Sequence, residues 1–213
     1  TTGANLYHDL HHSLDLPLFQ GSPFSNDSDL FEDEVIRIYD IFMDYKVLAA
    51  TDNWLLRTFA RPEFQRRMGT RELHYIMGKL TNEVEQEKGT VGKSFIAEAY
   101  RYEVPIYTSS PGDSTLGLDI AALNLIGKNI QIDSSIDVNE TAALVLEAKR
   151  IGKSGVIVWG GGSPKNFILQ PEPALQEVLG FDIKGHDYFV QVTDARPDTG
   201  GLSGATPNEA VSW

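Results

Sequence analysis

The chain has 213 residues, of which 41% are hydrophobic and 23% are charged, proportions that suit a globular α/β domain with a real core. Its formal net charge of -12 would repel a phosphate backbone, so no nucleic-acid partner is expected, and a cationic small molecule suits it better. The sequence contains no cysteine, which excludes disulfides and thiolate chemistry and fits a reducing, cytoplasmic compartment. No apolar run approaches the roughly 20 residues needed to cross a bilayer, so no membrane partner is expected either.

The first half of the chain is predicted to be mainly helical. Residues 20–29 are rich in Ser, Asn, Asp, Gly and Pro and are expected to form a surface loop. Apolar side chains over 35–43 recur at helical spacing, a second helix is expected from Asp52, as its N-cap, to about residue 68, and a third over 70–87. These patterns predict a helical segment over residues 27–90 within a single domain.

In the second half, β-prone segments alternate with helical ones. Strands are expected at 104–108, 130–132, 156–159 and 188–192. Helices are expected over 116–126 and 140–151, the latter with Asn139 as N-cap. The alternation predicts a Rossmann-like, doubly wound α/β fold over residues 1–213, with a mainly parallel sheet and helices on both faces. Ligands in this architecture bind beyond the carboxyl ends of the strands.

A glycine-rich turn, Gly160-Gly161-Gly162, follows one of these apolar strands. A dinucleotide-binding fingerprint would require a further glycine where Lys165 stands, so the standard match fails. The turn by itself is as consistent with a structural role as with cofactor binding.

Three histidines lie close together near the start of the chain. On a helix, His8 and His12 would share a face at metal-ligand spacing, with His11 beside them. The simpler interpretation is that they are surface or interface histidines, and no metal is expected.

Two polar segments are candidates for ligand binding. Residues 113–119 place two acids and two hydroxyls around a helix start, where one acid can cap the helix and two could also hold an ammonium group. Residues 193–201 form a long polar loop directly after an expected strand, a position where functional residues are common.

The two ends of the sequence indicate a piece of a longer protein. Thr206-Pro207-Asn208-Glu209 has the pattern of a capping box, and the helix that it opens would reach Trp213 before its second turn is complete. So short a helix is not stable alone. Thr1-Thr2-Gly3-Ala4 resembles a strand-to-helix turn without its strand and lacks the pattern of a signal peptide. We therefore expect the natural chain to continue.

Four of these blocks occur in the order seen in the deoxyhypusine synthase family, namely residues 1–4, residues 113–117, the glycine turn with Lys165, and residues 203–213. The resemblance covers essentially the whole chain, with a divergent middle from about residue 20 to residue 101. It implies NAD as cofactor and a homotetramer with active sites at subunit interfaces. It also implies transfer of an aminobutyl group from spermidine, through a lysine imine, to a lysine of a translation factor. Related enzymes use putrescine and make a small polyamine.

The resemblance also implies roles for individual residues. In the family the catalytic lysine follows the Ser-Trp pair after one glycine, so here it would lie beyond Trp213. Cofactor contacts are implied for Thr2, Gly3, Ala4, Asp113, Gly160, Gly161, Ala195 and Ser203. Substrate contacts are implied for Thr115, Asp119, Asn166, Glu209 and Trp213, with Asn166 also the catalytic candidate because it replaces a histidine tied to proton handling.

The chain departs from the family pattern at several polar positions. His8 and Leu202 each stand where the family has an acid, Gln191 replaces a tyrosine, and the acid of the 113–119 segment is displaced by one place to Asp119. These changes imply a prokaryotic branch that uses a different amine or has reduced activity. The alternative is a noncatalytic homologue or subunit that binds NAD or a polyamine.

Overall fold

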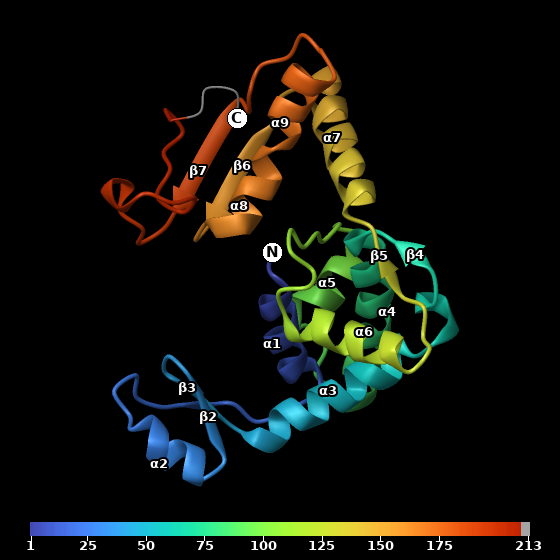
Figure 1. Cartoon of the computed structure of the whole chain (residues 1–213), viewed down its shortest axis with the longest axis vertical. Coiled ribbons are helices and arrows are strands. Elements are labelled where there is room, and N and C mark those ends of the chain that lie inside the picture. Colours follow the sequence, from blue (N-terminus) through green and yellow to red (C-terminus); the bar gives the residue numbers. More distant parts are fainter. Residues whose placement is uncertain (210–213) are drawn as a thin grey trace. The chain divides into compact units, whose positions relative to one another are not determined.

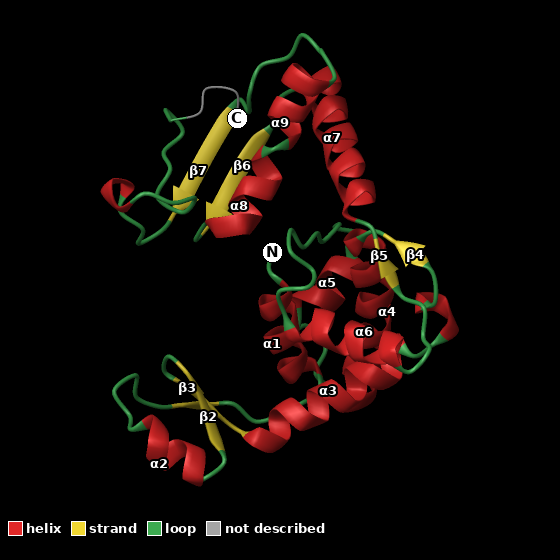
Figure 2. Ribbon diagram, in the orientation of Figure 1, coloured by secondary structure: helices red, strands yellow, loops and turns green. Residues whose placement is uncertain are grey.

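A computed structural model describes residues 1–209 of the chain. The chain forms two compact units, Thr1–Ile132 and Asp133–Trp213, called here the N-terminal and C-terminal units (Figures 1 and 2). Both helices and strands are present, which confirms a mixed α and β structure. The Rossmann-like, doubly wound arrangement and the expected single domain stay predictions. None of the helices in residues 1–209 has the length and apolar composition required to cross a membrane.

The N-terminal unit is built mainly from helices packed around one apolar core. They are α1 (Gly3–Ser13), α3 (Tyr45–Phe59), α4 (Thr70–Lys88), α5 (Phe95–Arg101) and α6 (Thr115–Leu125). Leu6 and Leu10 of α1, Leu55 and Phe59 of α3 and Met77 of α4 are fully buried in this core. Their spacing places them on one face of each helix, which is why these segments fold against one another. The predicted helices over 70–87 and 116–126 are confirmed.

Two short strands, β4 (Arg67–Met68) and β5 (Gln131–Ile132), form a parallel pair at the edge of this unit. A one-turn 3₁₀ helix, η1 (Pro62–Phe64), precedes β4. The predicted strand at 130–132 is thereby confirmed in its main part.

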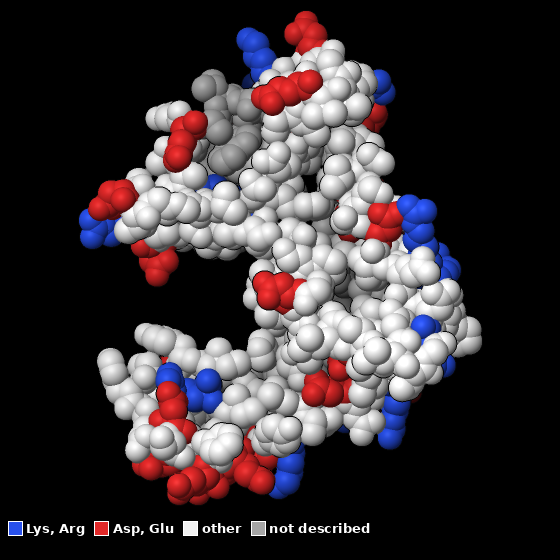
Figure 3. Space-filling model, viewed as in Figure 1, with Lys and Arg blue, Asp and Glu red and all other residues white. Residues whose placement is uncertain are grey.

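A small antiparallel sheet corrects the helix predicted over 35–43. Strands β2 (Val35–Ile38) and β3 (Ile41–Asp44) pair as a hairpin, β1 (Phe19–Gln20) adds to β3, and helix α2 (Asp27–Glu32) precedes the hairpin. The β-branched side chains here favour strands, and the two residues between β2 and β3 form a tight turn, with Tyr39 at φ 56°. Acidic side chains gather around α2 and this sheet (Figure 3).

Two further predicted helix starts and one predicted strand are wrong. Helix α3 begins at Tyr45, because Asp44 caps it by accepting a hydrogen bond from the Lys46 N–H, and Asp52 lies within the helix. Helix α7 (Ser134–Ile151) begins earlier than predicted because Asp133, rather than Asn139, is its N-cap. Residues 104–108 form no regular strand, since Pro105 has no N–H to donate to a sheet.

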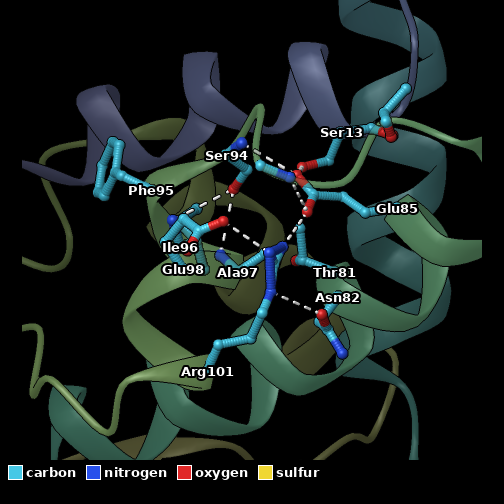
Figure 4. Close-up of polar contacts among 12 residues, drawn as sticks. Ser13, Thr81, Asn82, Glu85, Ser94, Phe95, Ile96, Ala97, Glu98 and Arg101 are labelled. Carbon is cyan, nitrogen blue, oxygen red and sulfur yellow. Dashed lines mark hydrogen bonds and ion pairs between the residues drawn. The ribbon is translucent and has the colours of Figure 1, made fainter.

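A buried carboxylate fixes the turn between α4 and α5. The Glu85 side chain is fully buried and accepts hydrogen bonds from the Ser13 hydroxyl at 3.1 Å and the Ser94 N–H at 2.9 Å (Figure 4). It also pairs with the Arg101 guanidinium, which Glu98 contacts from the other side at 2.6 Å. Because the carboxylate satisfies groups from α1, α5 and the turn together, it joins these elements within the N-terminal unit.

The C-terminal unit contains a strand–helix–strand motif. Strands β6 (Gly155–Trp159) and β7 (Tyr188–Val192) are parallel and in register from Gly155↔Tyr188 to Trp159↔Val192, which confirms both predicted strands. Between them lie α8 (Gly162–Leu169), α9 (Pro171–Pro173) and the π-helical turn η2 (Ala174–Val178), and η3 (Pro197–Thr199) follows β7. Val156 and Val158 pack against Leu169 of α8, so the helix covers one face of the pair. The parallel sheets within residues 1–209 have two strands each.

Candidate functional site

In the N-terminal unit, the start of α1 touches the start of α6. Thr2 caps α1 by accepting a hydrogen bond from the Asn5 N–H at 3.2 Å. Gly3 is buried, and a Cβ built on it would lie only 2.1 Å from the Ser114 Oγ, so only glycine permits this approach. The contact brings together two predicted site segments, residues 1–4 and residues 113–119. The site residues predicted in them are Thr2, Gly3, Ala4, Asp113 and Thr115.

Asp119 is buried in α6 and is electrostatically unusual. Its side chain is 8% exposed, and its Oδ2 has no hydrogen-bond partner among the described residues. Burial raises the pKa of Asp119 to about 7, and the nearby carboxylate of Asp52 adds to the shift. Asp52 in turn accepts a hydrogen bond from the Tyr7 hydroxyl at 2.6 Å. Two carboxylates near each other, one without a partner, can hold a proton or a cationic group.

The residue before Asp119 faces a different direction. Leu118 is 64% exposed, whereas Asp119 points into the helical core. Successive residues on a helix are separated by about 100° around its axis, so moving the acid by one place changes its environment completely. The displaced acid therefore lies among α1, α3 and α6 of its own unit.

In the C-terminal unit, the glycine turn lies where β6 ends and α8 begins. Gly160 has φ 81°, which favours glycine, and its N–H donates to the Val192 carbonyl at the end of β7, at 2.8 Å. A Cβ on Gly161 would lie 2.6 Å from the Ser203 Cα, so the turn and residue 203 are in direct contact. The N-terminal N–H groups of α8 face this turn, and such groups attract anions, including a pyrophosphate.

A buried lysine, Lys165, and a half-buried glutamine, Gln191, hold these two loops together. The Lys165 ammonium donates to the Gln191 side-chain oxygen at 3.0 Å and to the Ala205 carbonyl at 2.5 Å. Gln191 donates to the Gly160 carbonyl at 2.7 Å and to the Ser203 carbonyl at 2.9 Å. Burial lowers the pKa of Lys165. The pair thus ties the glycine turn to residues 203–205 at the carboxyl ends of β6 and β7.

The remaining predicted residues of this unit lie around that network. Asn166 is half-buried on α8, and its oxygen accepts a hydrogen bond from the Gln170 amide at 3.1 Å. Ala195 is in the loop after β7, where its N–H donates to the Thr193 hydroxyl at 3.1 Å. Glu209 is exposed, and its charge opposes the fall in the pKa of Lys165.

The capping-box prediction is tested only in part. The Glu209 N–H donates to the Thr206 carbonyl at 3.0 Å, which makes a turn over residues 206–209. Trp213 and the rest of the helix predicted from Pro207 lie outside the described residues.

Sequence reasoning missed two side-chain arrangements and misjudged a third. It gave no role to the Tyr7–Asp52 pair, and it treated Gln191 only as a departure from the family pattern. A polar residue in the apolar strand 188–192 was the available signal for Gln191. His11 is fully buried, so the surface interpretation of the histidines is wrong for it. In place of a metal-like pairing with His12, His8 contacts His11, with His8 Nδ1 and His11 Nε2 3.1 Å apart.

These features define an α/β protein with a glycine turn held at the carboxyl edge of a parallel strand pair. The family model for deoxyhypusine synthase matches residues 1–213, and the chain belongs to that family. It is 56% identical to a deoxyhypusine synthase-like protein of Nostoc punctiforme and 53% identical to one of Thermosynechococcus vestitus. It is 40% identical to a probable deoxyhypusine synthase 2 of Methanosarcina acetivorans.

All three matches cover 100% of this chain but only 55%, 54% and 59% of the respective relatives. The chain thus spans little more than half the length of the curated relatives that it matches.

Proposed function

We propose that this chain supplies part of the catalytic core of an NAD-dependent transferase. The enzyme would move an aminobutyl group from spermidine or putrescine, through a lysine imine, to an amine acceptor, which is a protein lysine or a small polyamine. Family membership over the whole chain supports this activity. We further propose a cytoplasmic homotetramer with sites at subunit interfaces, and a Rossmann-like, doubly wound sheet in the complete protein.

The contact between the glycine turn and residue 203 is the observation that carries the cofactor proposal. Gly160 is exposed with open space where a Cβ would be, and Gly161 packs against Ser203, so the turn presents backbone beside the start of α8, which suits the pyrophosphate of a dinucleotide. Ala195, in the loop after β7, and Thr2, Gly3, Ala4 and Asp113, in the N-terminal unit, would make further contacts. When bound, NAD would accept a hydride and later return it, so the reaction would involve no net oxidation.

Acidic and aromatic side chains would hold the amine. A carboxylate forms charge-assisted hydrogen bonds with an ammonium group, which suits Glu209 and the partner-free oxygen of Asp119. Thr115 and Trp213 would contact the rest of the donor chain, and an aromatic ring can pack on it. Asn166 would orient the reacting nitrogen, but an amide is a poor base, so the proton would leave through another group.

A trapping experiment on the full-length protein tests this proposal. The protein is incubated with NAD, spermidine or putrescine, and a reductant that converts an imine to a stable amine. We expect an aminobutyl adduct on the lysine that would follow Trp213 by two residues in the family pattern, located by peptide mass spectrometry. Omission of NAD should abolish the adduct.

A noncatalytic homologue that binds NAD or a polyamine is the second candidate. It is favoured by Leu118 and Leu202, which are 64% and 43% exposed at positions where the family pattern has acids. NAD binding without any trapped adduct from either amine would support this candidate and exclude transfer from spermidine or putrescine.

A further inference from the structure

A buried chain of hydrogen bonds leads from α3 to His8 in the N-terminal unit. The Thr51 Oγ1 lies 2.9 Å from the Val47 carbonyl oxygen and 2.9 Å from the His11 Nδ1. A hydroxyl has one hydrogen, and the Val47 carbonyl can only accept it. Thr51 must therefore accept in its contact with His11, so His11 carries its hydrogen on Nδ1.

The direction of this first bond determines the next one. Burial lowers the pKa of His11 to about 4, with His8 and His12 adding to the shift, so the ring is neutral at pH 7. Its Nε2 then has a lone pair and accepts from the His8 Nδ1, 3.1 Å away. His8 must carry its hydrogen on Nδ1. Burial also lowers the pKa of His8, so a neutral His8 has its free lone pair on Nε2.

His8 lines a pocket of about 590 Å³ within the N-terminal unit. Its walls are largely apolar and include Leu18, Phe19, Ile38, Ile41, Met43 and Phe95. The titratable side chains that line the pocket all come from α1, namely His8, Asp9, His11 and His12.

The buried carboxylate in the wall of this pocket, Asp9, is already committed. Asp9 accepts hydrogen bonds from the Ser94 hydroxyl at 2.6 Å and from the Phe95 and Ile96 N–H groups at 3.2 and 3.1 Å. Its carboxylate is therefore used to hold the start of α5. No protein group in residues 1–209 hydrogen-bonds to the His8 Nε2, which leaves it as a free acceptor in the wall of the pocket.

We propose that His8 Nε2 accepts an N–H or O–H hydrogen from a small molecule with an apolar body, and that His11 and Thr51 are positioning residues that hold this nitrogen unprotonated. The same nitrogen can take the proton outright: the ligand's N–H or O–H bond breaks, a bond to Nε2 forms, and the Nδ1–H bond to His11 stays intact. Loss of that proton to water restores neutral His8. A carboxylate or phosphodiester ligand brings no hydrogen to Nε2 and is disfavoured. This inference does not depend on the transferase activity.

Carbethoxylation of the full-length protein with diethyl pyrocarbonate tests the tautomer, because the reagent acylates only unprotonated imidazole nitrogens. Rates at each histidine are followed by peptide mass spectrometry between about pH 5 and pH 8. We expect the rate at His8 to reach half its maximum at a lower pH than the rate at the exposed His12. His11 should stay unreacted, because both of its nitrogens are hydrogen-bonded.

Variants of Thr51 separate positioning from general stability. Thr51→Val removes the hydroxyl but keeps the shape, so His11 and His8 can adopt the opposite tautomers. The rate at His8 should fall by about threefold to tenfold, while that at His12 stays unchanged. Thr51→Ser should restore the rate. An unchanged His8 rate in Thr51→Val would overturn the proposal. If Thr51→Val does not fold, the unmodified protein still tests the proposal. The proposal is overturned if the pH at which the His8 reaction rate reaches half its maximum equals or exceeds the corresponding pH for His12.

Two four-carbon probes test the class of ligand. 1-Butanol can donate its hydroxyl hydrogen to Nε2, whereas butyrate at neutral pH can only accept. We expect 1-butanol to slow the reaction at His8 but not at His12, and butyrate at the same concentration to have no effect. Equal protection of His8 by butyrate would refute the preference for a hydrogen-bond donor.

Discussion

Replacing Gly161 with Ala should weaken NAD binding, because the added methyl group would strike the loop that the glycine turn contacts. A Cβ at this position would lie 2.6 Å from the Ser203 Cα and 2.7 Å from its Oγ, whereas ordinary contacts begin at 3.4 Å. Residue 203 would have to move back by about 0.8 Å, the difference between these two distances. The shift would also strain the hydrogen bond from Gln191 to the Ser203 carbonyl.

The size of the effect follows from the cost of overpacking. Forcing an extra carbon into a well-packed contact costs about 1–3 kcal/mol. If both loops must be in place to hold the cofactor, the affinity for NAD should fall by about fivefold to a hundredfold. Isothermal titration of the full-length variant with NAD would measure this change directly.

Gly152→Ala is a matched control. Gly152 has φ 179° and ψ −125°, and Gly161 has φ 172° and ψ −132°, so an alanine meets nearly the same backbone geometry at both positions. A Cβ on Gly152 has nothing within 4 Å, so the two variants differ mainly in the contact with Ser203. Equal NAD affinity in the two variants would refute the assignment of this turn to the cofactor site.

Three further predictions concern buried or half-buried polar groups. Glu85→Gln should lower the free energy of unfolding by about 2–4 kcal/mol, because the neutral amide removes the carboxylate that pairs with the Arg101 guanidinium. Glu98→Gln should lower it by less than about 1 kcal/mol, and urea unfolding compares the two variants. Because the folded pKa of Asp119 is raised to about 7, its stabilising contribution is present at low pH and is lost as the pH rises toward 7. Asp119→Asn should therefore gain stability relative to the unmodified protein between about pH 4 and pH 7, and a constant difference in unfolding midpoint would contradict this. Gln191→Leu should weaken NAD binding by about tenfold in a titration, because it removes the bonds between the two loops, and an unchanged affinity would show that they are dispensable.

Several elements could be predicted from local sequence alone. The continuous apolar runs at 156–159 and 188–192 form β6 and β7, and the periodic segment 70–87 forms α4, because strong local patterns agree there with the tertiary environment. The hairpin at 35–44 could not be distinguished from a helix, since its apolar residues fit both periods until the turn at Tyr39 is known. The early starts of α3 and α7 were missed because several residues in each segment could serve as caps, and only Asp44 and Asp133 do so.

For the candidate site, the sequence by itself determined the residue types and the family, since the ordered blocks of glycines, acids and hydroxyls match one family pattern over the whole chain. Only the tertiary structure decided which of these residues meet. Ser203 lies 42 positions after Gly161 in the sequence, yet the two touch because β6 and β7 run parallel and end side by side. Asp119 is buried while Leu118 is exposed because a helix turns each residue toward a different environment. Contacts and burial of this kind arise from packing between distant segments, which local sequence patterns do not contain.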